Sequence, residues 1–348
     1  MPQDRRLASI VNAVNPGVPP LVEPFPETPT AWAQAYALSW PEYPERYVVR
    51  LIDAGASERE AVRIEFRAAR LLGEKGIGPA VRSADAEEGV LVMDRVDGHP
   101  VRPAARWQAL SVADLLAQLH SLAWDNPARL YAEKRRVAGD SVLRLTERIP
   151  ALALFGEALR EFDALRAGLR ELAVPQTLCH NDLNPGNMLF DGRRAWLIDF
   201  DHVGPGDPLF DVATAIDSLG LLPKDADAFL ARYFGRPPTE GEAARLELLG
   251  CLVLLRYGLS GLSLVPEELQ PGLASWTPDD IGEAWVFERA AHEALGRSVF
   301  RLSLGFATAG LARLRGEPAA RALRTLGIGT AVTARREAAL VGTGHAEW

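Results

Sequence analysis

The spacing of hydrophobic and polar positions divides the chain into two kinds of region. Between residues 20 and 100, short stretches such as "TAWAQAYALSW" and "RYVVRLI" alternate with a period of two or are rich in β-branched residues, which is typical of strands. Residues 58–75 differ, because their apolar side chains recur every three or four positions, and the glycines and proline at 76–79 then end the pattern. This part of the sequence predicts strands around one helix.

From about residue 104 onward the pattern is mainly helical. The stretches "SVADLLAQLHSL" and "EALREFDALRAGLREL" are amphipathic with a helical period, and similar spacing continues from Pro208 to about Leu326. Three short apolar pieces interrupt it, at 177–179, 188–190 and 195–198. We therefore expect a larger, mainly helical region with a few short strands inserted in its middle.

Composition and charge exclude several classes of function. The chain has 348 residues, enough for about two domains or lobes, and its 48% hydrophobic content is typical of a globular protein. A formal net charge of -8 argues against nucleic acid as a partner, and the eight-residue run "LLGCLVLL" is too short to span a bilayer. Cys179 and Cys251 fit neither a disulfide framework nor a zinc site. We expect a cytoplasmic protein with no membrane partner.

The stretch "LCHNDLNPGNMLF" places polar residues between apolar ends. Asp182 and Asn187 lie in a loop between two short predicted strands, and Asp199 follows the apolar run "WLI" at the end of the next strand. Two carboxylates and an amide offer oxygen ligands, which suit a hard cation such as Mg²⁺, and a carboxylate not used as a ligand can accept a hydroxyl proton. The spacing H-x-D-x-x-x-x-N, followed by D-F, matches a kinase catalytic segment. The alternative is a polar loop of local caps and turns.

The form "CHNDLNPGN…IDFD" resembles the aminoglycoside phosphotransferase and choline kinase superfamily of small-molecule kinases. Similar segments follow the family order: "YVVRLI", "IEFRAARLLGEKGIGP", "LVMDRVDG", "LLAQLHSL" and "GPGDPLFDVATA". The resemblance covers residues 47–217 and implies an α+β, bilobal protein-kinase-like fold. Residues 1–97 would form the N-lobe that covers the nucleotide, with a five-stranded sheet and one helix. Residues 98–348 would form the mainly helical C-lobe, with the catalytic loop, the metal site and the acceptor-binding helices.

The resemblance also implies roles for individual residues. Asp182 would be the catalytic base, and Asn187 and Asp199 would bind Mg²⁺. Arg50 would contact the phosphates of ATP and be held in place by Glu65. The residues expected to line the adenine site are Met93, Asp94, Arg95 and Val96. In addition, Asp211 would brace the catalytic loop.

Two departures from the family pattern leave alternatives open. The stretch from Leu21 to Trp40 contains no glycine where a Gly-rich phosphate loop would stand, and Arg50 replaces the lysine of many relatives, as on the choline kinase side of the superfamily. The missing loop favours a catalytically weak or inactive pseudokinase that binds nucleotide or ligand, whereas the intact catalytic segment opposes it. A protein kinase is disfavoured, since the chain lacks an A-P-E segment and a D-F-G glycine.

The sequence leaves the acceptor open among an amino alcohol, a vitamin or nucleoside-like metabolite, and an aminoglycoside. The acidic balance favours a cationic, amine-bearing alcohol over a neutral sugar. Residues 239–326 are expected to supply the acceptor site and contain Tyr257, Trp276 and Trp285. The stretch "SWTPDDIGEAW" is an aromatic and acidic candidate, although its Thr-Pro-Asp-Asp order equally fits the start of a helix.

Overall fold

The computed structural model describes residue 6 and residues 20–24, 33–40, 43–53, 59–125, 153–263 and 295–328. Its strands are β1 (Leu21–Pro24), β2 (Ala33–Trp40), β3 (Tyr43–Ile52), β4 (Val81–Asp85), β5 (Val90–Asp94), β6 (Thr177–Cys179), β7 (Met188–Phe190), β8 (Ala195–Leu197) and β9 (Gly204–Gly206). Its helices are α2 (Arg59–Glu74), α3 (Arg106–His120), α5 (Ala153–Glu171), α6 (Pro208–Ser218), α7 (Pro223–Phe234), α8 (Glu240–Ser263), α10 (Leu295–Arg315) and α11 (Glu317–Thr325), with short 3₁₀ turns η2 (Pro185–Asn187) and η3 (Phe200–His202).

These elements form two compact units. The first contains β1 to β9 together with α2, α3 and α7, and the second contains α5, α8, α10 and α11. Helix α6 contributes to both, because its residues up to Asp211 group with the first unit and Val212–Asp217 with the second. This division groups the large sheet with the catalytic segment, so it does not test a lobe boundary at residue 97. That boundary stays a prediction.

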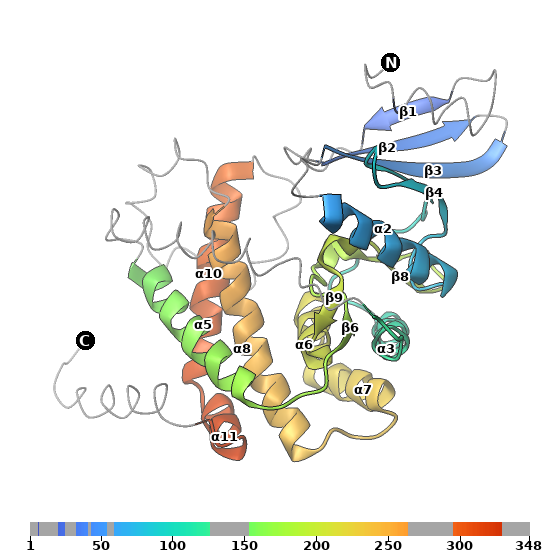
Figure 1. Ribbon diagram of the computed structural model, residues 1–348. Helices are drawn as coiled ribbons and strands as arrows, with labels where there is room; N and C mark the ends of the chain where they lie inside the picture. The colour runs from blue at the N-terminus through green and yellow to red at the C-terminus, as the bar shows by residue number, and fades with distance from the viewer. Residues whose placement is uncertain are drawn as a thin grey trace. The chain divides into compact units, whose positions relative to one another are not determined.

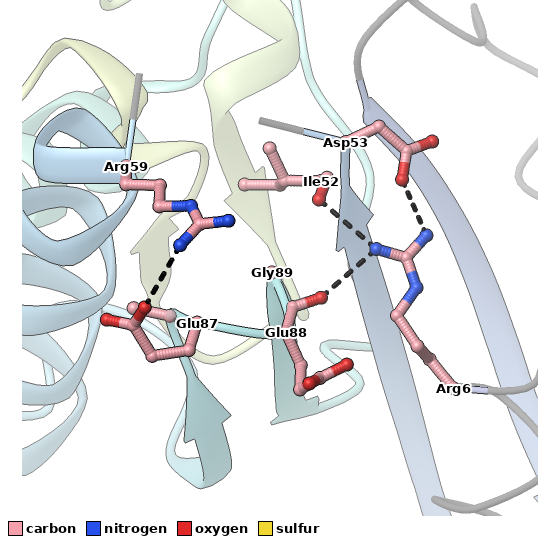
Figure 2. Close-up of a pocket in the computed structure, with 8 residues that line it drawn as sticks. Arg6, Ile52, Asp53, Arg59, Glu87, Glu88 and Gly89 are labelled. Atoms are coloured by element: carbon pink, nitrogen blue, oxygen red, sulfur yellow. Dashed lines mark hydrogen bonds and ion pairs between the residues drawn. The ribbon is translucent and has the colours of Figure 1, made fainter. Parts of the chain in front are cut away.

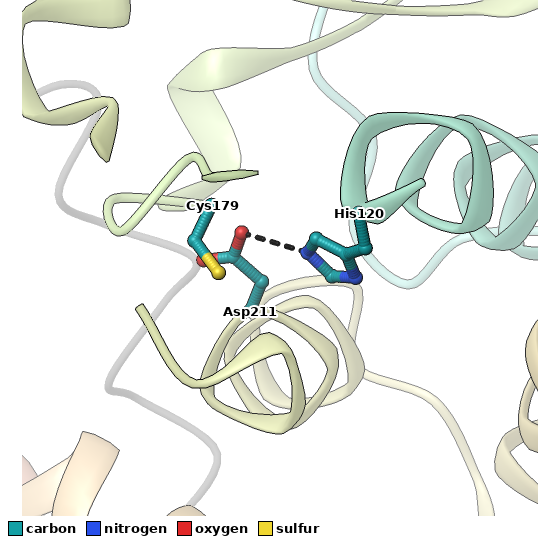
Figure 3. Close-up of side chains that lie close together, drawn as sticks. All are labelled: His120, Cys179 and Asp211. Carbon is teal, nitrogen blue, oxygen red and sulfur yellow. Dashed lines mark hydrogen bonds and ion pairs between the residues drawn. The ribbon is translucent and has the colours of Figure 1, made fainter. Parts of the chain in front are cut away.

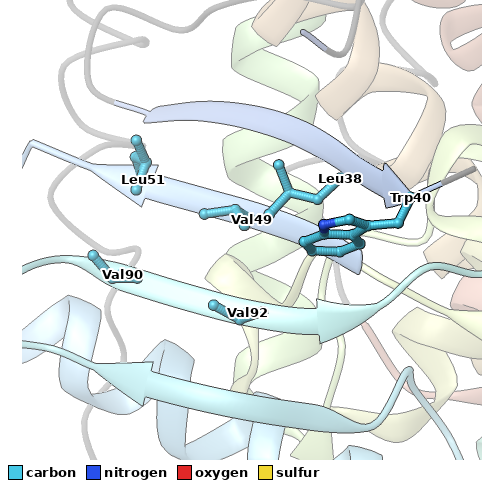
Figure 4. Close-up of a cluster of buried hydrophobic side chains, with 6 residues drawn as sticks. All are labelled: Leu38, Trp40, Val49, Leu51, Val90 and Val92. Atoms are coloured by element: carbon cyan, nitrogen blue, oxygen red, sulfur yellow. The ribbon is translucent and has the colours of Figure 1, made fainter. Parts of the chain in front are cut away.

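The first unit is built on a five-stranded antiparallel sheet with the order β1-β2-β3-β5-β4. One face of the sheet carries an apolar cluster, drawn in Figure 4, because alternate residues of a strand share a face. Trp40 packs edge-on against Tyr47 across the β2–β3 pair, with ring centroids 6.1 Å apart. The members of the cluster are Leu38, Trp40, Val49, Leu51, Val90 and Val92.

The opposite face of the same sheet presents a charge. Arg50 lies between Val49 and Leu51 on β3, so the strand's period of two directs its side chain away from the apolar cluster. Helix α2 supplies the partner, since Glu65 belongs to its buried side together with the apolar residues around it. Glu65 is only 5% exposed, and the alternation of the strand and the spacing of the helix together bring its carboxylate to Arg50.

The end of α2 is fixed by its glycine and joined to the catalytic segment. Gly76 has a φ of 68°, and the N–H groups of Gly76 and Ile77 donate to the carbonyls of Gly73 and Leu72, which is a Schellman motif. The carbonyl of Ile77 then accepts a hydrogen bond of 3.0 Å from the N–H of Leu197 in β8. The helix that carries Glu65 is thereby tied to the strand that precedes Asp199.

The second unit is a helical bundle in which α5, α8 and α10 run side by side (Figure 1). Glycines allow the closest approach, because a Cβ at Gly258 of α8 would lie 2.7 Å from the backbone nitrogen of Ala307 in α10. Arg313 of α10 clamps α6 to α8 through ion pairs with Asp217 and Glu247. None of the helices in the described ranges has the length and apolarity needed to cross a bilayer.

Candidate functional site

Two short antiparallel ladders frame the predicted catalytic segment. Strand β6 pairs with β9, and β7 pairs with β8, so the loop from β6 to β7 and the loop from β8 to β9 both run between the two ladders. The N–H of Ile198 donates to the backbone carbonyl of Asn187 at 3.1 Å, which joins the two loops directly. The structure therefore brings Asp182 and Asn187 of the first loop next to Asp199 of the second.

The first loop is held by a buried carboxylate. Asp211 accepts hydrogen bonds from the backbone N–H groups of His180, at 2.6 Å, and Asn181, at 2.8 Å. These contacts support the role of loop brace predicted for Asp211. The His180 ring is fully buried, and its Nε2 carries the proton because it donates to the carbonyl of Ile198 at 2.9 Å. His180 therefore holds the loop in place.

Behind the loop, His120, Cys179 and Asp211 place their polar atoms within 4.8 Å of one another (Figure 3). Such a group has the donor types of a metal centre. Hydrogen bonds already occupy it, however: His120 Nε2 lies 3.2 Å from Asp211, and His120 Nδ1 lies 2.8 Å from the hydroxyl of Tyr233. We interpret the group as part of the loop brace, with His120 as a packed, hydrogen-bonded histidine.

Asp182 and Asn187 face each other within the loop. The amide Nδ2 of Asn187 donates to the backbone carbonyl of Asp182 at 2.8 Å. Because this fixes the orientation of the amide, Oδ1 is the atom that Asn187 has left for a cation. The Asp182 carboxylate accepts a hydrogen bond of 3.2 Å from Asn184, a residue that the sequence reasoning did not assign to the site.

Arg50 connects the sheet to the second loop. Its Nη1 donates to Asp199 Oδ1 at 2.6 Å, and its Nε lies 3.1 Å from Glu65 Oε1, although it is not aligned for a hydrogen bond. Asp201 lies 3.9 Å from the guanidinium. Asp199 has a φ of 63°, and this left-handed conformation places it at the turn between β8 and η3.

The charges in this cluster shift one another's ionisation. Burial by itself lowers the pKa of Arg50, but the carboxylates of Glu65, Asp199 and Asp201 raise it above its usual value, so the guanidinium keeps its charge. Burial and the neighbouring Asp199 raise the pKa of Asp201 to about 8, against the opposing effect of Arg50. The cluster therefore holds more acidic groups than its one arginine neutralises, which favours a further cation.

The donor set fits Mg²⁺. Asp199 offers a carboxylate that is about one-third exposed, and Asn187 offers an amide oxygen whose orientation is fixed. Hard cations take carboxylate and carbonyl-type oxygens, usually keeping water in the remaining positions. The residues predicted as metal ligands therefore have the right chemistry and lie on joined loops.

The segment expected to line the adenine site lies at the end of β5. Met93, Asp94, Arg95 and Val96 are all half-buried. The side chain of Asp94 is bound by Arg82 at 2.6 and 2.7 Å, and the N–H groups of Asp94 and Arg95 donate to the carbonyls of Ala80 and Arg46. A base bound here would therefore use the remaining backbone groups and the apolar side chains of the segment.

A small polar pocket lies at the C-terminal end of β3 and is lined by Ile52 and Asp53, the second and third residues after Arg50 (Figure 2). Arg6 bonds there to the carbonyls of Ile52 and Glu88 and to the carboxylate of Asp53, while Arg59 pairs with Glu87 at 3.6 Å. Both guanidinium groups have protein partners, so we assign this pocket no part in the candidate site.

Sequence reasoning missed the side chains that shape the catalytic loop. Asn181 has a φ of 64°, and its Nδ2 lies within 3.3 Å of the carbonyls of Cys179, His202 and Gly204. Asn184 caps η2. The signal for both was present, since asparagine tolerates the left-handed region and commonly caps a turn before Pro-Gly. The acceptor candidates Trp276 and Trp285 lie outside the described residues.

Comparison with known proteins places this geometry in a family. The model of the phosphotransferase enzyme family matches residues 31–247, which is more than half of the chain. The protein LicA of Haemophilus influenzae is 47% identical over 55 residues, which are 16% of this chain and 21% of LicA. The chain thus matches only about a fifth of that relative's length.

Solved structures extend the likeness over most of the chain. A choline/ethanolamine kinase family protein from Mesorhizobium loti has a TM-score of 0.66 at 17% identity, covering 93% of this chain and 99% of that one. The ADP-bound aminoglycoside phosphotransferase APH(2'')-Ib has a TM-score of 0.55 at 18% identity, covering 78% and 96%. At these identities the likeness establishes the fold, and it confirms the predicted kinase-like α+β architecture. Together with the family model it identifies the chain as a member of the phosphotransferase enzyme family, the superfamily that its catalytic segment predicts.

Proposed function

We propose that this protein transfers the γ-phosphoryl group of ATP to a hydroxyl group of a small molecule. The observation that supports this most strongly is the convergence of Asp182, Asn187 and Asp199 on joined loops, with Arg50 held 2.6 Å from Asp199. Family membership and the ADP-bound relative of the same fold agree with it. Phosphoryl transfer depends mainly on positioning and on neutralising charge, and these residues offer both.

In this proposal the residues divide the work. Asp182 accepts the proton of the attacking hydroxyl, because its carboxylate is held in the loop without being needed as a ligand. Arg50, kept charged by Glu65, binds phosphate oxygens with its planar donors. Asn187 and Asp199 would hold Mg²⁺, which supplies positive charge to the phosphates when bound.

The nucleotide would lie against the sheet, with its base at the segment formed by Met93, Asp94, Arg95 and Val96. This follows from the placement of Arg50 on the same sheet, on β3 beside β5. In the register of the two strands, Arg50 is paired with Leu91, three positions before Asp94. A strand rises about 3.3 Å per residue, so the two positions lie about 10 Å apart, which leaves room for a base and a ribose before the phosphates reach Arg50.

For the acceptor we propose an amine-bearing alcohol. The net charge of -8 favours a cation by steering, and the M. loti structure of the same fold is named for the choline/ethanolamine kinase family. A cationic acceptor should lose kcat/KM as salt rises, since ions screen the charge of the protein. A neutral sugar should show no such dependence.

The test is transfer of labelled phosphate from γ-labelled ATP to choline, ethanolamine, an aminoglycoside, a thiamine-like alcohol and a neutral sugar. Reactions run with Mg²⁺ and with a chelator, at two ionic strengths. We expect Mg²⁺-dependent transfer to an amino alcohol, with the rate falling at high salt. Nucleotide binding without transfer to any acceptor would favour a pseudokinase, and a salt-insensitive preference for the sugar would exclude the cationic acceptor.

A further inference from the structure

Asn184 bridges two parts of the catalytic loop. Its Oδ1 accepts a hydrogen bond of 2.9 Å from the N–H of Gly186, and its Nδ2 donates to Asp182 Oδ2 at 3.2 Å. The orientation of the amide is determined by chemistry, because a backbone N–H can only donate and so must face the oxygen. The nitrogen is then necessarily the atom that faces Asp182.

The backbone and the carboxylate of Asp182 are held by different residues. Asn187 donates to the backbone carbonyl of Asp182 at 2.8 Å, and its distance to Oδ2 is 3.5 Å, at the limit of a hydrogen bond. Asn184 makes the shorter contact to Oδ2. A carboxylate rotates easily about its last bond, since that torsion has broad minima. A donor on one oxygen is what restricts this rotation.

We propose that Asn184 is a positioning residue that holds the carboxylate of Asp182 in the orientation in which it receives the proton of the acceptor. This inference rests on the proposed function, which makes Asp182 the base. Asn184 acts through Asp182 and needs no contact with the substrate. The hydrogen bond from Gly186 fixes the orientation of the Asn184 amide, and this orientation directs its Nδ2 to Asp182.

The two roles of Asn184 can be separated by substitution. Asparagine, aspartate and serine are about equally good as caps, so Asn184→Asp and Asn184→Ser both keep an acceptor for Gly186. Asn184→Asp replaces the donor with a second carboxylate that repels Asp182. Asn184→Ser removes the donor without adding charge, because its hydroxyl is too short to serve both partners.

The experiment measures kcat and KM with MgATP and the acceptor that responds in the transfer assay, together with Kd for MgADP and the Tm. We expect kcat to fall by roughly 10-fold or more in Asn184→Asp and by a smaller factor in Asn184→Ser, while Kd and KM for nucleotide change by less than about twofold. The Tm should stay within about 2 °C of the wild type in both.

A matched control comes from the next turn of the chain. Asp191 Oδ1 accepts hydrogen bonds from the N–H groups of Arg193 and Arg194, so Asp191→Asn alters a cap of the same kind outside the proposed machinery. It should leave kcat unchanged. An Asn184→Asp variant with wild-type kcat would overturn the inference while the proposed function stands. Equal losses of kcat, nucleotide binding and Tm would also overturn it, by assigning Asn184 to folding alone. A wild-type protein that transfers no phosphate would overturn both proposals.

Discussion

Each of the two compact units contains a partly buried arginine that binds carboxylates from distant segments, but the two clusters differ in balance. Arg313 donates from Nε and Nη2 to both oxygens of Glu247 at 3.1 Å, and from Nη1 to Asp217 at 3.3 Å. All three residues lie on helices, in regular backbone. This fork-to-fork geometry pairs two parallel donors of the arginine with the two oxygens of one carboxylate.

The cluster around Arg50 is less complete. Its Nε lacks an aligned acceptor, Asp199 stands in a left-handed turn, and the pKa of Asp201 is raised to about 8 by burial and by Asp199. Strained backbone and a surplus of acid cost stability, and proteins keep such features mainly where they are used. The difference indicates that the cluster of Arg313 is a structural clamp and that of Arg50 is a site prepared for ligands.

The largest expected effect is a loss of activity when Arg50 is removed and the Arg313 cluster is left intact. Arg50→Ala should lower kcat/KM for ATP by roughly 10²-fold or more, because it removes the positive charge aimed at the phosphates. Glu65→Gln should act in the same direction but more weakly. Arg46, near the start of the same strand, pairs with exposed Asp97, so Arg46→Ala is the matched control. Equal and small losses in both arginine variants, measured by steady-state kinetics, would show that the phosphates lie elsewhere.

The reciprocal change removes Arg313 and leaves the Arg50 cluster intact. Arg313→Met should lower the free energy of unfolding by about 2 kcal/mol, less than for a fully buried pair because a third of the arginine side chain is exposed. It should leave Kd for MgADP within about twofold of the wild type. Denaturant unfolding and nucleotide titration check the two quantities. A large loss of nucleotide affinity with unchanged stability would reverse the roles assigned to the two arginines.

Helix packing in the second unit gives a third, smaller effect. Gly258→Ala should destabilise the protein by about 1 to 3 kcal/mol, since the new methyl group would meet the backbone of Ala307. Gly241 lies in the same helix with open space around its Cβ position, so Gly241→Ala should be neutral or stabilising by up to about 1 kcal/mol. Thermal unfolding of both variants is the measurement, and similar Tm changes in the two would contradict the close packing of α8 and α10.

The smallest effect concerns Cys251, next to the Arg313 cluster. Burial raises the pKa of its thiol to about 12, so the thiolate that reacts with alkylating reagents is scarce at pH 8. Native protein should therefore resist iodoacetamide at Cys251, and unfolded protein should react. Because the folded pKa exceeds the unfolded one, this group's contribution to stability is complete below about pH 9 and is lost as pH rises through about 12. Rapid alkylation of the native protein, seen by mass spectrometry, would contradict this.

Local patterns made much of this molecule predictable from its sequence. The period-two stretch became β2, the β-branched stretch became β3, and the helical spacing at 58–75 became α2. Asp182, Asn187 and Asp199 lie on joined loops as expected. The pattern did not reveal β9, because its sequence Gly-Pro-Gly has low strand propensity and is a strand through its pairing with β6.

Other features depend on contacts between distant segments, which no local pattern encodes. The three carbonyls gathered by Asn181 come from β6, η3 and β9, and those of η3 and β9 lie 21 and 23 residues away in the sequence. The bond between Ile77 and Leu197 likewise joins segments far apart in the sequence. Roles for Arg50 and Glu65 came from family resemblance. The contact between these two side chains depends both on the face of β3 to which Arg50 points and on the position of Glu65 on the buried face of α2.

The most direct test of the central claim compares Asp182→Asn with Asp199→Ala in one experiment that measures both phosphate transfer and Mg²⁺-dependent ADP binding. We predict that Asp182→Asn binds MgADP like the wild type but transfers phosphate roughly 10²-fold or more slowly, because only the proton acceptor is lost. Asp199→Ala should lose the Mg²⁺ dependence of binding along with transfer, since a ligand of the ion is removed. Near wild-type transfer by Asp182→Asn, or unchanged Mg²⁺-dependent binding by Asp199→Ala, would contradict the account.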